Sequence, residues 1–257
     1  MKKIQKILIT NDDGFDAIGL EILKDIANKF SEVVYTVSPK KNQSAKSKSI
    51  TINKEIHFDK ISNYVWVVDG TPTDCIIFAL NHIMKTDKPD LILSGINAGS
   101  NVGDEVSYSG TVAAAWEGAV RGINSISLSQ YGGDNTIESY TCSKNHSFEI
   151  INHLINLKTR SPFFFNINFP YILSNVSHIQ NFCFTKLESQ KKGDEIIMNE
   201  NSKYFRIGRM INYNKTSSQT DLDILKDNRI SITPLSLNLT NDKLLNELKK
   251  KEINNVI

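Results

Sequence analysis

Short apolar runs alternate with longer amphipathic segments through the first two thirds of the chain. The segment 19–30 places Leu20, Leu23, Ala27 and Phe30 on one helical face. Six short runs have the composition of buried strands: 6–10, 32–38, 63–70, 91–95, 125–129 and 162–170. Four segments of helix length lie among them: 19–30, 71–84, 111–122 and 147–157. Strands separated by such helices pair in parallel, so the pattern predicts a doubly wound α/β sheet.

After Pro170 the pattern changes from alternating strands and helices to hairpin-like pieces. Within residues 195–210, the polar segment 199–203 separates two strand-like runs. A further strand is predicted over 229–237, where Pro234 closes it, and a lysine-rich helix over 241–251. We therefore expect two parts: a domain over residues 1–180, and a C-terminal hairpin and helix extension over residues 181–257.

Composition narrows the class of protein. The chain has 257 residues and is 40% hydrophobic, which is enough for a substantial core. Its net charge of +2 is too small to indicate an obligate nucleic-acid partner, and we find no basic stripe with interleaved aromatics. Three widely spaced cysteines favour a reducing compartment. No apolar run has membrane-spanning length, so we expect a soluble cytoplasmic protein without a membrane partner.

Polar loops follow four of the predicted strands. They read NDDGFDAIG after 6–10, PKKNQSAKSKS after 32–38, DGTPTD after 63–68, and SGINAGSNVGDEVSYSGT after 91–93. Open parallel sheets bind ligands beyond the carboxyl ends of their strands. We therefore expect these loops to meet at one edge of the sheet and to form the functional site there.

Asp12 and Asp13 are the strongest candidates for a metal site. Asp13 and Gly14 together are also a common hairpin signal, but a helix comes next, so no hairpin closes there. A sharp turn at Gly14 would aim both carboxylates at one point, and they would repel each other without a cation or a shared proton between them. Oxygen ligands favour Mg²⁺ or Mn²⁺ over zinc.

The lysine-rich loop after the second strand reads, by itself, as a solvated surface loop. Its expected place at the same edge gives it a second interpretation. The Ser44 hydroxyl could complete the coordination of a hard cation, and the lysines would favour an anionic substrate. The lysines concerned are Lys40, Lys41, Lys46 and Lys48.

The loop over residues 95–111 is far longer than a turn requires. Asn97 and Asn101 offer amide groups near the strand end. Ser109, Gly110 and Thr111 stand at the start of a helix, where free N–H groups and the helix dipole bind anions such as phosphate. The alternative is that Ser109 or Thr111 only caps the helix. The loop is neither a Walker A motif nor a dinucleotide fingerprint.

Together these motifs, with ISITPLSLNLT near the C-terminus, resemble the SurE (survival protein E) family of metal-dependent nucleotidases. The resemblance covers about residues 6–129 and 219–240 and is weak between them. It implies a Rossmann-like domain, a C-terminal extension swapped within a homodimer or homotetramer, and one divalent cation per subunit. By position, it makes Asp12, Asp13, Ser44 and Asn97 the metal ligands, with Ser109, Gly110 and Thr111 at the phosphate. Ala45 departs from the family's usual glycine.

The expected activity is hydrolysis of nucleoside 5′- and 3′-monophosphates by a metal-activated water. Asp12 and Asp13 would hold the metal, one of them also orienting or deprotonating the water, while Asn101 and the helix start would bind phosphate. A covalent aspartyl-phosphate mechanism is the chemical alternative, although it usually uses aspartates one residue apart. A nucleotide-binding or phosphate-binding regulator without turnover is the alternative from another functional class.

Overall fold

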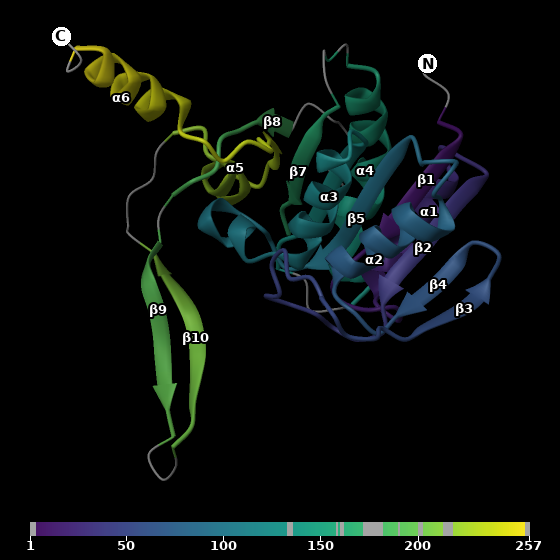
Figure 1. Cartoon of the computed structure of the whole chain (residues 1–257). Helices are drawn as coiled ribbons and strands as arrows, with labels where there is room; N and C mark the ends of the chain where they lie inside the picture. The colour runs from purple at the N-terminus through teal and green to yellow at the C-terminus, as the bar shows by residue number, and fades with distance from the viewer. Residues whose placement is uncertain are drawn as a thin grey trace.

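The computed structural model describes residues 4–132, 136–157, 159, 162–171, 182–189, 191–199, 203–212 and 218–254. Its centre is a mostly parallel sheet with helices on both faces (Figure 1). The strand order is β3-β4-β2-β1-β5-β6-β7-β11-β8. Strands β4, β2, β1, β5, β6 and β7 run parallel, whereas β3 and β11 are antiparallel to β4 and β7. The doubly wound α/β prediction is confirmed.

The strands of this sheet have the following bounds: β1 Lys6–Thr10, β2 Val33–Pro39, β3 Phe58–Ser62, β4 Val65–Val68, β5 Leu91–Ala98, β6 Asn124–Gln130, β7 Phe164–Phe169, β8 Phe182–Phe184 and β11 Ile230–Pro234. The helices are α1 Ile18–Asn28, α2 Pro72–Phe78, α3 Gly110–Val120, α4 Thr141–Ile155, α5 Asp221–Lys226 and α6 Asp242–Asn254. A π-helix over Ala79–Ile83 continues α2, and 3₁₀-helices cover Gly103–Ser107 and Glu138–Tyr140.

Two apolar cores form because side chains of a strand alternate between its faces. On one face, Ile7 and Ile9 of β1 pack in the same buried cluster as residues of α1 and α4. On the other face, Leu8 packs in a cluster with residues of α2 and α3. Burial on both faces explains why the strands read as continuous apolar runs.

The start of α2 agrees with the sequence. Thr71 is the N-cap: its hydroxyl oxygen accepts the Asp74 N–H at 3.1 Å, and the Asp74 carboxylate accepts the Thr71 N–H at 2.9 Å. Pro72 occupies the first helical position, where its missing N–H costs nothing. This capping box fixes the point at which the chain turns from β4 into the helix.

Several elements differ from the sequence-based expectation, among them β3, α5 and α4. Strand β3 was not predicted, because most of its side chains are exposed and it has no buried apolar run. Helix α5, which has six residues, is too short to show a helical period. Helix α4 begins at Thr141 rather than near 147, because its first turns are mostly polar.

The C-terminal region contains the predicted hairpin. Strands β9, Lys191–Met198, and β10, Phe205–Asn212, pair antiparallel and extend away from the sheet (Figure 1). Of the predicted separating segment 199–203, residues 200–202 lie outside the described residues. Strands β8 and β11 join the central sheet, and the division of the chain near residue 180 stays a prediction. In the described part of the chain, no helix is long and apolar enough to cross a membrane.

Candidate active site

The loop after β1 and the start of α3 meet at Asp12. This aspartate is only 4% exposed, and its Oδ1 accepts a hydrogen bond from the Thr111 hydroxyl. A Cβ at Gly110 would lie 2.9 Å from Oδ2 of Asp12, so a larger residue at 110 would push the helix away. The structure thus brings Asp12, one of the two predicted carboxylates, into direct contact with the predicted phosphate cradle.

Asp13 is held by the end of β5. Its Oδ2 accepts the Ala98 N–H at 3.0 Å. Ala98 directly follows Asn97 in the chain. The Asn97 amide nitrogen donates to Gly99 O at 2.8 Å. Asp13 and Asn97 are both half-buried, in contrast to Asp12.

Burial shifts both carboxylates toward the protonated form. It raises the pKa of Asp12 to about 6, with the Thr111 hydrogen bond opposing the shift and the charge of Asp13 adding to it. Burial also raises the pKa of Asp13, while the Ala98 N–H opposes that shift. A cation bound between the two groups would favour their ionised forms.

The loop with Ser44 is fastened across the turn at residues 12–14. The Gln43 N–H donates to Asp12 O at 2.7 Å, and Asn42 Oδ1 accepts the Ser44 N–H at 2.8 Å. Gly14 has φ +106°, and a Cβ there would lie 3.1 Å from the carbonyl carbon of Lys41. The close approach of the two loops therefore depends on a glycine. Ser44 itself is exposed.

Asn101 lies in a buried amide network on the side of β6 and β7. Its Nδ2 donates to Ser129 Oγ at 2.8 Å, and its backbone N–H donates to Asn168 Oδ1 at 2.8 Å. Its carbonyl oxygen accepts from the side-chain amides of Asn166 and Asn168. These contacts fix the loop, and a direct role of Asn101 in phosphate binding stays a prediction.

Ser109 and Thr111 have different roles at the start of α3. Ser109 is the N-cap, and its Oγ accepts the Val112 N–H at 3.1 Å, as the capping alternative requires. Its hydroxyl proton can still be donated to a ligand. Thr111 does not cap the helix; it bonds to Asp12. The capping alternative therefore accounts for one of the two hydroxyls.

A hard divalent cation fits the donor atoms at this edge. Asp12, Asp13, Asn97 and Ser44 offer carboxylate, amide and hydroxyl oxygens, which suit Mg²⁺ or Mn²⁺. Among the described residues there is no group of three or more His, Cys, Asp or Glu that could hold a metal ion, so a cation at this edge would also need the amide and hydroxyl oxygens. Within the same described part, several buried side-chain oxygens of this edge lack a hydrogen-bond partner: Thr10 Oγ1, Asn11 Oδ1, Ser38 Oγ and Ser94 Oγ.

Asp221 is a functional candidate that the sequence analysis missed. Its carboxylate accepts the Gly103 N–H at 2.7 Å and the Glu188 N–H at 2.9 Å, and it is fully buried. It thereby ties the C-terminal segment to the loop between Asn101 and Ser109. Gly103 is 118 positions away in the chain, so no local pattern could have indicated the contact.

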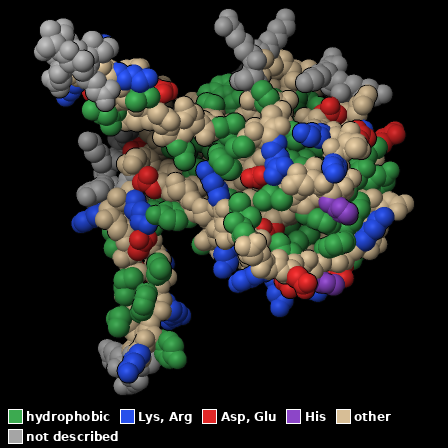
Figure 2. All heavy atoms as spheres, in the orientation of Figure 1, with side chains coloured by type: hydrophobic (Ala, Val, Ile, Leu, Met, Phe, Trp, Pro, Cys, Tyr) green, Lys and Arg blue, Asp and Glu red, His purple; other side chains and the backbone are tan. Residues whose placement is uncertain are grey.

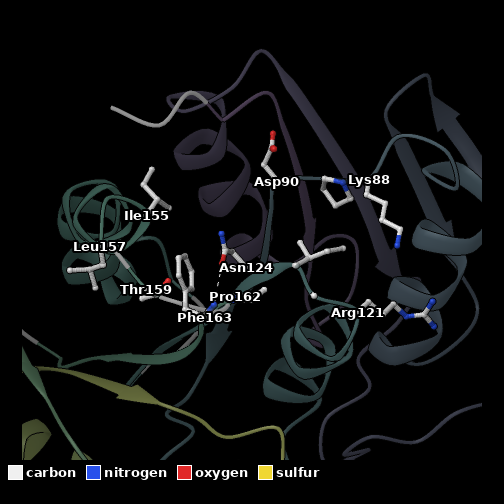
Figure 3. Close-up of a pocket in the computed structure, with 12 residues that line it drawn as sticks. Lys88, Asp90, Arg121, Asn124, Ile155, Leu157, Thr159, Pro162 and Phe163 are labelled. Atoms are coloured by element: carbon white, nitrogen blue, oxygen red, sulfur yellow. Dashed lines mark hydrogen bonds between the residues drawn. The ribbon is translucent and has the colours of Figure 1, made fainter.

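Two of the cavities lie at opposite edges of the sheet. A cleft of about 450 Å³ at the carboxyl edge is lined by residues 13–18 and 40–42. Another cavity, of about 520 Å³, includes Asp90, Arg121 and Phe163 at the amino edge (Figure 3). There Asp90 accepts the Gln5 and Lys6 N–H groups, and Arg121 bonds to Glu117 and Asn81. Asp90 and Arg121 thus have partners within the chain, and a functional site at the carboxyl edge stays a prediction.

Comparison with known proteins shows the family of the chain. The sequence profile of the family "Survival protein SurE" matches residues 7–194, a span that includes the site residues predicted from the sequence but not Asp221. The chain belongs to the SurE family. A protein named 5′-nucleotidase SurE from Methylorubrum extorquens is 36% identical over 247 residues, which is 92% of this chain and 95% of the relative. Another of that name, from Paramagnetospirillum magneticum, is 37% identical over 238 residues and 91% of each chain.

A solved SurE structure has the same fold. The SurE protein from Aquifex aeolicus superposes with a TM-score of 0.82 at 29% sequence identity, over 96% of this chain and 99% of that one. The family profile ends at residue 194, whereas the structural match includes most of the C-terminal region. The resemblance drawn from the sequence motifs is confirmed.

Proposed function

We propose that the protein is a divalent-metal-dependent phosphomonoesterase that hydrolyses nucleoside 5′- and 3′-monophosphates to nucleoside and phosphate. Relatives named 5′-nucleotidase SurE support the activity. The observation that carries the proposal is the contact of α3 with Asp12, through the Thr111 hydroxyl and the close approach of Gly110. It joins an anion-binding helix start to a pair of carboxylates, which is the arrangement that a metal-assisted phosphatase needs.

The proposed ligands of one Mg²⁺ or Mn²⁺ are Asp12, Asp13, Ser44 and Asn97. When bound, the cation would neutralise phosphate charge and lower the pKa of a water molecule. Asp13 is the better candidate to orient that water or accept its proton, because it is only half-buried and, among the described residues, the backbone contact of its carboxylate is made by Oδ2. Asp12 is buried against the helix and is better suited to holding the metal.

The start of α3 would hold the phosphate. The N–H groups of the first helical turn have no partner within the helix, and Ser109 satisfies that of Val112. The Thr111 N–H also interacts with the Asp12 carboxylate, so the Gly110 N–H and the Ser109 hydroxyl proton are the donors that would bind phosphate oxygens. Donors fixed in this way stabilise charge on the equatorial oxygens in the transition state.

Phosphate release from AMP tests the proposal. Activity should require Mg²⁺ or Mn²⁺, disappear after chelation with EDTA, and return when the metal is restored. Full activity after exhaustive chelation would contradict the metal site. A protein that binds AMP with metal but releases no phosphate would instead be the regulator considered above.

We also propose that the extension joins two or four copies of the chain. On one face of the hairpin, Met198 lies opposite Phe205 and Ile196 opposite Ile207, and each of the four is more than half exposed. Figure 2 shows hydrophobic side chains gathered along the hairpin. Apolar side chains on a projecting hairpin are typical of an interface.

The free cysteines Cys75, Cys142 and Cys183 are compatible with the reducing cytoplasm.

A further inference from the structure

The cleft at the carboxyl edge begins at a proposed metal ligand. Asp13 lines one end of it, and Asn42, whose Oδ1 accepts the Ser44 N–H, lines another part. Phe15, Lys40 and Lys41 also line this cleft. Its volume of about 450 Å³ falls in the range of small-molecule sites.

We propose that this cleft binds the nucleoside part of the substrate, with the ring of Phe15 as the surface on which the nucleobase packs. The inference rests on the proposed function and adds to it the residue that recognises the leaving group. The ester oxygen of a nucleotide is bonded to the phosphorus, so the nucleoside must occupy space that adjoins the metal and phosphate positions. The cleft adjoins them through Asp13.

Phe15 is suited to this role by its packing. It is half-buried and lies against the apolar cluster that includes residues of α1, so the core holds its ring. A second cavity of about 330 Å³ shares Phe15 and Asp16 with the cleft. Thr36 lines that cavity, and its Oγ1 is buried with no hydrogen-bond partner among the described residues. The open space therefore continues beyond the Phe15 ring, and the Thr36 hydroxyl lines it.

The lysines of the cleft add charge that favours an anionic nucleotide. Lys40 lies 3.8 Å from Asp59, with both side chains about half exposed, so this ion pair is weak. Lys41 is exposed at the same margin. Both lysines line the cleft that Asp13 also lines.

Tyr108 is the competing surface for the base. It precedes the helix cap Ser109 directly and is 49% exposed. Lys191 already covers its ring, with Nζ 4.5 Å from the ring centroid and 3.1 Å from the hydroxyl oxygen. The Tyr108 ring thus has a partner within the chain, whereas Phe15 borders an open cleft.

Kinetics with a nucleotide and with its base-free counterpart test the proposal. Phe15→Leu, assayed in Mn²⁺, should raise KM for AMP roughly 5- to 100-fold, as expected for the loss of one base–aromatic contact. Its kcat/KM for ribose 5-phosphate should stay near that of the wild type, because this substrate has no base. Phe15→Tyr keeps the ring and should keep the wild-type KM.

Phe30→Leu is the matched control. Phe30 is also half-buried against the same apolar cluster, but it follows the far end of α1 and stacks on Phe148 with centroids 4.5 Å apart. It should lose stability as Phe15→Leu does, without a selective change for AMP. Tyr108→Leu completes the set and should leave KM for AMP nearly unchanged.

Two results would overturn the inference: equal effects of Phe15→Leu on both substrates, or an AMP-selective loss in Tyr108→Leu instead. If the wild type releases phosphate from neither substrate, the proposed function fails. Calorimetric titration with AMP in Mg²⁺ still decides the cleft in that case. Weaker AMP binding by Phe15→Leu than by Phe30→Leu supports it, and equal binding by the two variants contradicts it.

Discussion

The carboxyl edge of the sheet and the C-terminal extension depart from the usual distribution of side chains in opposite directions. At the edge, polar atoms such as Asn11 Oδ1 and Ser94 Oγ are buried without a hydrogen-bond partner within the described structure. In the extension, Phe205 and Ile207 of β10, and Leu244 and Leu248 of α6, are largely exposed. Each region is unfavourable as it stands.

The difference matches the two proposals made for these regions. Buried polar groups are stabilised by an ion or a polar substrate, and exposed apolar groups by another protein surface. Substitutions should separate the two accordingly. Changes at the edge should reduce catalysis and leave assembly intact, and changes in the hairpin should do the reverse.

The largest effect is expected at the carboxylate pair. Asp12→Asn and Asp13→Asn should each lower turnover by at least about 100-fold, because outer-shell partners of metal ligands alone cost up to that factor. The metal-free fold should survive, since removing one of two neighbouring charges relieves repulsion. Phosphate release and thermal unfolding measure the two parts. Near-normal turnover, or an unfolded variant, would make the pair structural.

The hairpin should give the next largest effect. Phe205→Ser with Ile207→Ser should weaken self-association by roughly 30-fold or more, if either residue is an interface hot spot. Arg206→Ser, on the opposite face of the same strand, is the control and should change association little. Sedimentation velocity at micromolar concentration measures both. A wild type that sediments as a monomer would remove the assembly proposal.

Thr111→Val should lower metal affinity as well as turnover. The substitution keeps the shape of the side chain and removes the hydroxyl that donates to Asp12. As an outer-shell partner of a proposed ligand, it should cost about 10- to 100-fold. Titration with Mn²⁺ in the absence of nucleotide isolates the metal term. Unchanged metal affinity would mean that Asp12 is positioned by burial alone.

Ser109→Ala should have a smaller effect, of a different kind. Loss of the cap should lower the unfolding free energy by about 0.5–2 kcal/mol. If the hydroxyl also donates to phosphate, inorganic phosphate should inhibit the variant more weakly than the wild type. Thermal unfolding and phosphate inhibition therefore separate capping from binding. Unchanged inhibition would reduce Ser109 to a helix cap.

The smallest effect is expected at Ala45, one residue after Ser44. Its φ of +59° lies in the left-handed region, where an alanine is strained by roughly 1–2 kcal/mol. Ala45→Gly removes the strain but adds about 0.4–1 kcal/mol of unfolded-state entropy. The unfolding free energy should therefore rise by about 1 kcal/mol or less. A clear loss of stability would show that the Cβ of Ala45 has a packing role.

Local patterns predicted the buried strands and the polar loops that follow them. Asp12 and Asp13 could be found because a charged pair directly after a buried strand is unusual, and parallel strands place such loops together. The contacts that join the loops were not predictable. Thr111 meets Asp12 across 99 positions, and Asp221 meets Gly103 across 118. Such pairings depend on how the helices lie across the finished sheet.

The position of β11 has a consequence for how the protein is made. This strand pairs with β7 on one side and β8 on the other, yet it is synthesised after the hairpin of β9 and β10. At a synthesis rate of about 5–20 residues per second, the edge of β7 stays unpaired for roughly 3–12 s before β11 has been made. During that interval the nascent chain presents an unpaired apolar strand. We expect chaperone binding and aggregation during synthesis to concentrate at this strand edge.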